Sequence, residues 1–345
     1  MSTLIDLSTD GLACSPPIRG RTPERAFGGA GSHGAFRPYH KPADAIQGRV
    51  LARAPYRNFG AEPFRAPAAA SVEASSEEYA RAVELNQIFT RPAVARLLWH
   101  SFLKHFDPGK YLMMEPSAGE GAFLALLPSG SVGIDLDPKR EGVIEADFLR
   151  TMTWSAKPIA VIGNPPYGRV ARTAIAFVNH AAKQAEVVAF ILPRSFRKAA
   201  IVNRLHSHLH LLHEEDVPDN AFTFRLKSKH VPTVFQIWVR RPWPREPRFT
   251  GTRHPDFEFV KDSALADFAI QRIGAQAGTV HLDVTADTSW HYLVRGDVLD
   301  VMTRLPFKDR ARDTAGTPSL AKCEIVELYA EYVSRNPSAR RASPP

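Results

Sequence analysis

A short proline-rich stretch, Asn164-Pro165-Pro166-Tyr167, carries residue types that can act on an amine. Asn164 offers a side-chain carbonyl that accepts hydrogen bonds, and the backbone carbonyl of Pro165 lies beside it. Two acceptors on one conjugated –NH2 group hold both of its hydrogens, which draws the nitrogen toward tetrahedral geometry and frees its lone pair for attack. Tyr167 can stack on the ring that carries the amine. The stretch therefore indicates an amine-activating loop, although these residues alone form a plain loop in many proteins.

The elements around this loop are those of an α/β fold. Residues 158–162 form an apolar run typical of a buried strand, and the prolines must end it because proline cannot donate to a strand ladder. Helices are predicted from residue 92 to about 106 and over 173–184 and 196–205. Further strands are predicted near residues 111–116, 131–136, 143–148, 187–193, 209–212 and 229–239. This alternation predicts a largely parallel sheet with helices on both faces.

Several polar or small residues fall at the ends of these strands. The turn at residues 119–121 contains two glycines and lets the backbone approach a ligand, before a predicted helix, although it is not the dinucleotide fingerprint. Asp135 can accept from both hydroxyls of a ribose. Asp147 can accept from an adenine amine, and Phe148 can cover the adenine face. Because ligands bind beyond the C-terminal ends of parallel strands, we expect one shared site that includes Asn164.

Thr90 precedes the predicted helix and is expected to be its N-cap, since Pro92 stands early in that helix. Two roles stay open for Thr90. It either caps the helix only, or its hydroxyl and the helix N-terminus together face a carboxylate.

These motifs together resemble the S-adenosylmethionine-dependent amino-methyltransferases, most closely the adenine-N6 DNA methyltransferases with an Asn-Pro-Pro-Tyr motif and the gamma order of motifs, over residues 87–239. The resemblance implies a Rossmann-like class I methyltransferase fold with a mostly parallel seven-stranded sheet. It implies S-adenosyl-L-methionine as the cofactor and Asn164, Pro165, Pro166 and Tyr167 as the catalytic loop. It assigns the flipped base to Tyr167, Phe222 and Phe224. It assigns the cofactor to Thr90, Glu115, Pro116, Ser117, Ala118, Gly119, Gly121, Asp135, Asp147, Phe148 and Asn164.

The implied reaction is site-specific methyl transfer to the exocyclic N6 amine of a flipped adenine in DNA. Adenine in RNA is the first alternative, followed by cytosine N4 and the amide of protein glutamine, because each presents a conjugated –NH2 group. An alternative of another class is a non-catalytic nucleic-acid-binding module on the same fold. Intact Asn164 and Asp135 argue against that module, because a dead copy needs neither.

Composition favours a nucleic-acid partner and a cytoplasmic protein. The formal net charge of the 345-residue chain is +8, which suits a polyanion. Cys14 and Cys323 form no disulfide or zinc motif, and the histidines between 206 and 213 lack a metal-site pattern, so no metal is expected. No apolar run is long enough for a membrane span, and no signal peptide is visible. Candidate phosphate contacts are Arg194, Arg197, Lys198, Arg225, Lys227 and Lys229.

Composition and the resemblance together predict four segments. Residues 1–75 form a disordered basic arm rich in Pro, Gly and Arg, and 76–244 form the methyltransferase domain. Residues 245–333 form a small α+β domain for substrate recognition or an accessory role, and 334–345 form a disordered tail. The target sequence, the strand state of the substrate, the oligomeric state and a separate restriction nuclease as partner stay open.

Overall fold

The computed structural model describes residues 3–6, 88–224, 227–285 and 287–337. The predicted basic arm from residue 7 to 75, Arg225 and the last eight residues of the predicted tail lie outside the described residues. Within the arm, Thr3–Asp6 is described and forms strand β1, parallel to β6 (Thr151–Trp154). The partner strand of these four residues lies far along the chain, and the disorder of the arm stays a prediction.

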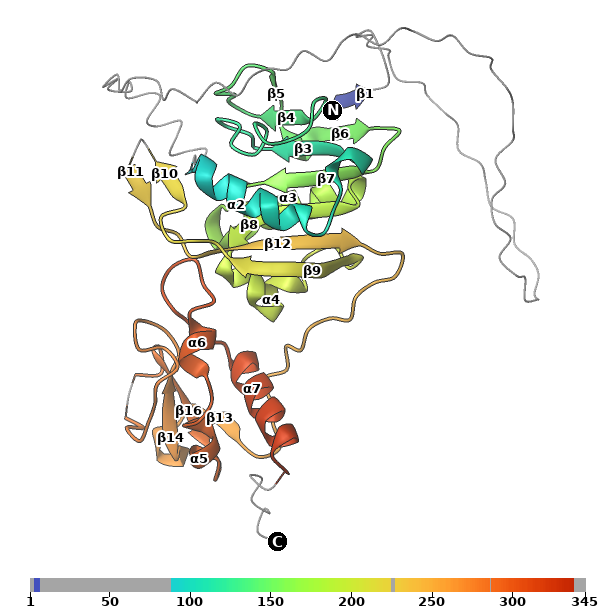
Figure 1. The fold of residues 1–345 in the computed structure, drawn as a ribbon. Coiled ribbons are helices and arrows are strands. Elements are labelled where there is room, and N and C mark those ends of the chain that lie inside the picture. The colour runs from blue at the N-terminus through green and yellow to red at the C-terminus, as the bar shows by residue number, and fades with distance from the viewer. Residues whose placement is uncertain (1–2, 7–87, 225–226, 286, 338–345) are drawn as a thin grey trace, which may run out of the picture. The chain divides into compact units, whose positions relative to one another are not determined.

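The central element is a seven-stranded sheet with the order β5-β4-β3-β7-β8-β12-β9 (Figure 1). Strands β5 to β8 in this order are parallel, and β12 is inserted antiparallel between β8 and β9. The strands are β3 (Leu112–Pro116), β4 (Val132–Asp135), β5 (Val143–Glu145), β7 (Ile159–Gly163), β8 (Val187–Pro193), β9 (Leu209–Asp216) and β12 (Thr233–Arg240). The order confirms the Rossmann-like, mostly parallel sheet. It reverses between β3 and β7, which creates a ligand-binding crevice at their C-terminal ends.

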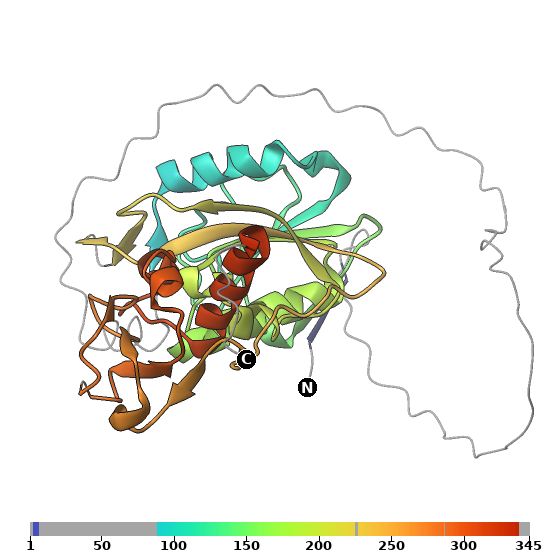
Figure 2. The same cartoon turned by 90° about the horizontal axis from the view of Figure 1, so that it is seen from below.

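Both faces of the sheet are buried, because helices cover each of them. Side chains along a strand point alternately to the two faces, so neighbouring residues belong to different cores. Met113 and Ile162 belong to the core on one face, where helix α2 (Pro92–Leu103) packs. Met114 and Val161 belong to the core on the other face, with α3 (Arg172–Gln184) and the short α4 (Ala199–Val202). Figure 2 shows α2 (cyan) and α3 (green) on opposite sides of the strands. The continuous apolar runs of β7 and β8 follow from this double burial.

Two small regions differ from the prediction. Residues 119–126 form successive turns instead of a regular helix, because Gly119 and Gly121 take positive φ values and the N–H groups of Phe123 and Leu124 donate to the Glu115 side chain. The predicted long strand from residue 229 is divided. Its beginning belongs to a three-stranded sheet made of β2 (Phe89–Thr90), β10 (Phe222–Phe224) and β11 (Lys227–Lys229).

The C-terminal residues form an α+β unit with its own core. Its antiparallel sheet has the order β13-β16-β14-β15, and α7 (Lys322–Arg335) buries Ile325 against Phe268 and Val294 of this sheet. The other elements of this unit are β13 (Glu258–Val260), β14 (Phe268–Gln271), β15 (Val280–His281), β16 (His291–Arg295), α5 (Leu299–Met302) and α6 (Phe307–Ala311). Short 3-10 helices occur at Pro108–Lys110, Phe148–Arg150, Arg169–Ala171, Arg194–Arg197 and Ser263–Leu265.

Candidate active site

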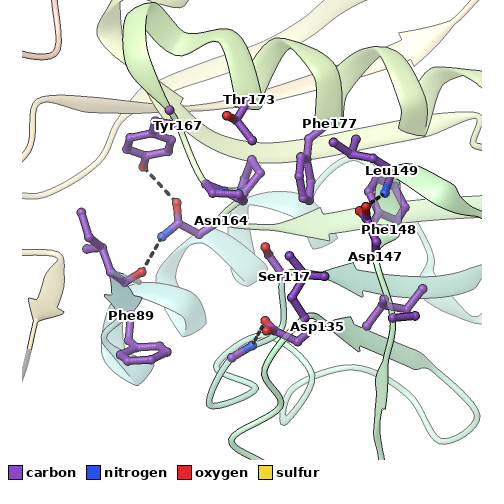
Figure 3. Close-up of a pocket in the computed structure, with 18 of the residues that line it drawn as sticks. Phe89, Ser117, Asp135, Asp147, Phe148, Leu149, Asn164, Tyr167, Thr173 and Phe177 are labelled. Carbon is purple, nitrogen blue, oxygen red and sulfur yellow. Dashed lines mark hydrogen bonds between the residues drawn. The ribbon is translucent and has the colours of Figure 1, made fainter. Parts of the chain in front are cut away.

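A cavity of about 510 Å³ opens where β3, β4 and β7 end. Its size lies within the range of small-molecule sites. Figure 3 shows Asn164 and Tyr167 on one side of it and Asp147 and Phe148 on the other. The lining residues are Ile88, Phe89, Ser117, Gly119, Ile134, Asp135, Leu136, Ala146, Asp147, Phe148, Leu149, Asn164, Pro165, Pro166, Tyr167, Gly168, Thr173, Phe177 and Ala315. The structure thus brings together the four residues of the proline-rich loop and the acids at the strand ends.

Asn164 is held in one orientation by two hydrogen bonds. The Tyr167 hydroxyl donates to Asn164 Oδ1 over 2.9 Å, and Asn164 Nδ2 donates to the backbone carbonyl of Ile88 over 3.3 Å. The carbonyl of Ile88 can only accept, so the amide nitrogen must face it. Burial raises the pKa of Tyr167, which keeps the phenol protonated and able to donate. One lone pair of Asn164 Oδ1 remains for a further donor.

The residues after Tyr167 fix this loop to α3. The N–H groups of Thr173 and Ala174 both donate to the Tyr167 carbonyl over 3.2 Å. Gly168 has φ 67°, and a Cβ there would lie 2.2 Å from Thr173 Oγ1, so the position requires glycine. Val170 has φ 54° in the left-handed region, which is costly for a β-branched residue, and its side chain is 75% exposed. The proline-rich loop is therefore followed by a strained connection.

Asp135 joins two turns beside the cavity. Its Oδ2 accepts from the N–H of Gly119 over 2.7 Å and its Oδ1 accepts from the N–H of Asp137 over 2.8 Å. Each oxygen keeps a lone pair for another donor. A Cβ on Gly119 would lie 2.8 Å from the ring of Phe89, so glycine here permits the close approach between β2 and the turn. The carboxylate is thus oriented before any ligand binds.

Glu115 lies behind the same turn and does not line the cavity. It is 3% exposed, and its oxygens accept from the N–H groups of Phe123 and Leu124 over 3.3 and 2.6 Å. Burial raises the pKa of Glu115 to about 8, although the two N–H donors and Arg140 lower it. Its geometry is that of a brace for the turn, which differs from the direct cofactor contact implied by the resemblance.

Asp147 and Phe148 border the cavity, but both side chains already contact other parts of the protein. Asp147 Oδ1 accepts from the N–H of Leu149 over 2.9 Å, which caps a 3-10 turn. Phe148 is 2% exposed and packs against Phe177 and His180, with ring centroids 5.3 and 4.9 Å away. The predicted role of Phe148 as an open cover for adenine does not match this burial, because the ring is part of the core.

Other predicted residues lie outside the cavity. Phe222 is 1% exposed and packs in the core beside α2, so it cannot stack on a base. Thr90 is not the N-cap of α2, since Arg91 occupies that position and the buried Thr90 hydroxyl has no partner among the described residues. Absent from the lining are Thr90, Glu115, Pro116, Ala118, Gly121, Phe222 and Phe224.

Three predicted phosphate contacts are paired with acids instead. Arg194 lies 3.1 Å from Asp216. Arg197 lies 2.8 Å from Glu214, and Lys198 lies 2.9 Å from Glu324 at the start of α7. The prediction of phosphate contacts missed these pairs because the acidic partners stand up to 126 residues away in the chain.

Two of the histidines between residues 206 and 213 contact backbone carbonyl groups. His208 Nδ1 and His210 Nε2 lie 2.9 and 3.0 Å from the backbone carbonyl oxygens of Arg241 and Trp243. Within residues 3–6, 88–224, 227–285 and 287–337, no group of three or more His, Cys, Asp or Glu is placed to hold a metal ion. The helices in the described part of the chain are all too short or too polar to cross a bilayer.

Some cavity residues were not predicted from sequence. Leu136 and Ala146 flank the predicted acids, and Phe89 belongs to the motif that contains Thr90, so proximity in sequence was a usable signal. Thr173 lies in the first turn of α3 and Phe177 in the second, on the side that faces the loop (Figure 3). Ala315 comes from the C-terminal unit, and no local pattern marks it.

The strand order and the position of the cavity define a Rossmann-like fold. No protein-family model and no curated protein matches the chain. Among solved structures, a Pyrococcus horikoshii protein described as a candidate RNA methyltransferase is 20% identical, with a TM-score of 0.35, over 46% of this chain and 88% of that chain. The magnesium protoporphyrin IX methyltransferase of Synechocystis PCC 6803 is 12% identical, with a TM-score of 0.32, over 43% and 78%. At these values the comparisons carry no inference about substrate.

Proposed function

We propose that this protein is an S-adenosylmethionine-dependent methyltransferase that methylates N6 of adenine in DNA. The observation that carries the proposal is the cavity itself. It places the oriented amide of Asn164 and the ring of Tyr167 together with the carboxylate of Asp135 and the glycine turn at 119. One half of the cavity suits a nucleoside-containing cofactor, and the other half suits a planar amine.

The residues present fit this cofactor. Asp135 would accept from the ribose hydroxyls, since it stands at the end of β4 with a lone pair left on each oxygen. Ile134, Leu136 and Ala146 supply apolar surface for an adenine ring. Ser117 and Gly119 line the cavity next to Asp135 and would border the methionine part of the cofactor. When bound, the cofactor would supply an electrophilic sulfonium methyl group.

The loop after β7 would prepare the acceptor. Asn164 Oδ1 and the Pro165 carbonyl would accept the two hydrogens of the exocyclic amine and stabilise the positive charge that develops on nitrogen. Because the Tyr167 hydroxyl and the Ile88 carbonyl already hold the amide, this acceptor needs no reorientation during the reaction. Tyr167 would stack on the flipped base.

The choice of adenine in DNA rests on the resemblance of the motifs and on the net charge of +8. Every acceptor with a conjugated –NH2 group suits Asn164 equally well. Adenine in RNA is therefore the second candidate, and the same experiment distinguishes the two.

The test uses methyl-labelled S-adenosylmethionine with duplex DNA, single-stranded DNA, RNA and a protein extract. Each acceptor is then digested and analysed by mass. We expect label in N6-methyladenine from DNA. Label confined to RNA or protein would overturn the DNA assignment, and bound cofactor without any transfer would favour a binding module.

Two variants separate the roles within the cavity. Asn164→Ala should abolish turnover while cofactor affinity stays within about twofold, and Asp135→Asn should weaken cofactor binding first. Asn336→Ala is the matched control, because Asn336 is an exposed amide beyond α7. Loss of cofactor binding in a folded Asn164→Ala protein would contradict the role given to Asn164.

A further inference from the structure

Three cations and two aromatic rings gather on the C-terminal sheet and at the start of α7. Lys322 Nζ lies 4.7 Å from the ring centroid of Phe259 and 5.4 Å from that of Tyr292. The Arg272 guanidinium lies 4.9 Å from the Tyr292 centroid. The two rings meet edge to face, with centroids 5.5 Å apart. Lys261 follows β13 on the surface nearby. We call these five residues the cation–aromatic surface.

The cations of this surface lack acidic partners. Among the described residues, no carboxylate lies within 4.0 Å of the charged groups of Lys261, Arg272 or Lys322. Other arginines of the same unit are paired, as Arg295 is with Glu258 and Arg310 with Glu327. The cation–aromatic surface therefore carries uncompensated positive charge.

The three charges also act on one another. Burial and the charges of Arg272 and Lys261 lower the pKa of Lys322 below its ordinary value. Like charges that are held together without acids gain when an anion binds among them. The aromatic rings keep the cations in place, because a cation over a ring face is attracted by the ring.

A half-exposed tryptophan, Trp290, is bonded through its backbone to Arg272. The Trp290 carbonyl accepts from the N–H of Arg272 over 2.8 Å, and the Trp290 side chain is 50% exposed. An exposed indole offers a face on which an unpaired base can stack. Phosphate-binding cations beside a stacking ring are the combination found in proteins that bind single-stranded nucleic acid.

Backbone hydrogen bonds join the residues around Arg272 to a segment that follows a cavity-lining residue. The N–H of Leu320 donates to the Arg272 carbonyl over 2.8 Å, and the N–H of Gly274 donates to the Pro318 carbonyl over 3.0 Å. Ala315, which lines the cavity, stands five residues before Leu320. Five residues span at most about 18 Å, so one nucleic-acid strand can touch both places.

We propose that the cation–aromatic surface and Trp290 together bind a single-stranded segment of the nucleic acid whose base enters the cavity. This proposal rests on the proposed function. Arg272, Lys322 and Lys261 contact phosphate groups, and Trp290 stacks on a base. A single strand is favoured over a duplex because only an unpaired base exposes its face to an indole.

The test measures binding of the full-length protein to a fluorescein-labelled 20-nucleotide single-stranded DNA by anisotropy at several salt concentrations. The variant Lys261→Gln/Arg272→Gln should bind about tenfold more weakly. Its log–log salt slope should fall by about 1.4, since each lost contact with a single strand removes about 0.7. Trp290→Ala should weaken binding with an unchanged slope, because it removes stacking and no charge.

The matched control is Arg304→Gln/Lys308→Gln, which removes two exposed positive charges from α6 and the residues before it in the same unit. It should bind within about twofold of the unaltered protein. Equal weakening in the control, or no weakening in the first variant with its fold intact by circular dichroism, overturns the proposed surface. If Trp290→Ala does not change binding, the surface contacts phosphate only, and this result also overturns the proposal.

The outcomes separate the two proposals. If no acceptor is methylated but the variants lose binding as expected, the surface stands and the proposed function fails. If adenine in DNA is methylated and the variants bind and methylate like the unaltered protein, only the surface fails. Equal loss of duplex binding in these variants overturns the assignment to a single strand.

Discussion

Glu115 should make the stability of this protein depend on pH. Its carboxyl group is buried behind the turn at 119–121, and burial raises its pKa from 4.5 to about 8. Nearby, Arg140 and two backbone N–H groups lower the pKa, and Asp135 raises it. An unfolded chain has no such burial, so its carboxyl group titrates near the ordinary value.

The direction of the effect follows from the higher pKa of the folded state. Between about pH 4.5 and 8 the folded protein keeps a proton that the unfolded chain has lost. The stability that this proton contributes is complete below pH 4.5 and is lost as the pH rises through 8. One proton corresponds to a fall in the free energy of unfolding of at most about 1.4 kcal/mol per pH unit.

The variant Glu115→Gln should remove this slope, because glutamine stays neutral. One of its amide N–H groups faces a backbone N–H, so the variant should be less stable than the unaltered protein at pH 5, by about 1–3 kcal/mol. The difference should shrink, or change sign, by pH 7.5. Urea unfolding followed by circular dichroism at pH 5, 6, 7 and 7.5 measures it.

The matched control is Glu120→Gln, since Glu120 is exposed and stands five residues along the chain. Its unfolding free energy should follow that of the unaltered protein at every pH. Parallel curves for Glu115→Gln and the unaltered protein would refute the reasoning, because they would show that Glu115 binds no extra proton on folding.

Three further predictions concern side chains around the cavity and the C-terminal unit. Tyr167→Phe removes the hydroxyl that donates to Asn164. Turnover should fall by about tenfold to a hundredfold while cofactor affinity is kept, since an unmade hydrogen bond costs about 1–3 kcal/mol. Turnover equal to that of the unaltered protein would contradict this role. Val170→Gly should raise the thermal midpoint, because the left-handed backbone costs a branched residue about 1–2 kcal/mol, and a lower midpoint would be inconsistent with strain. Lys198→Met should destabilise the protein by about 3 kcal/mol or more in thermal unfolding, because it leaves Glu324 buried without a cation. The control Arg310→Met breaks a more exposed pair with Glu327 and should cost less.

The sequence by itself was enough for the central sheet and for the core of the candidate site. The apolar run before Asn164 predicted β7, and the two prolines marked its end, because both signals act on a few neighbouring residues. Asp135 and Gly119 were found in the same way, at the ends of β4 and β3. Since parallel strands end at one edge of a sheet, their positions in the chain predicted that they would meet.

Local patterns misjudged residues whose surroundings come from distant parts of the chain. The resemblance assigned Phe222 to the flipped base, but pairing of β10 with β2 places it in the core next to α2. Lys198 was a candidate phosphate contact, but its partner Glu324 stands on α7. Neither apolar periodicity nor spacing carries information about a contact made across more than a hundred residues.

The tertiary structure alone decided how the site is held and what adjoins it. The hydrogen bond from Asn164 to Ile88 fixes the amide across 76 residues, and Ala315 brings the C-terminal unit to the cavity. The grouping of Arg272 and Lys322 around Tyr292 depends on how β14, β16 and the start of α7 pack. Such contacts depend on the packing of whole elements against one another, whereas propensities and turn signals describe only the residues within each element.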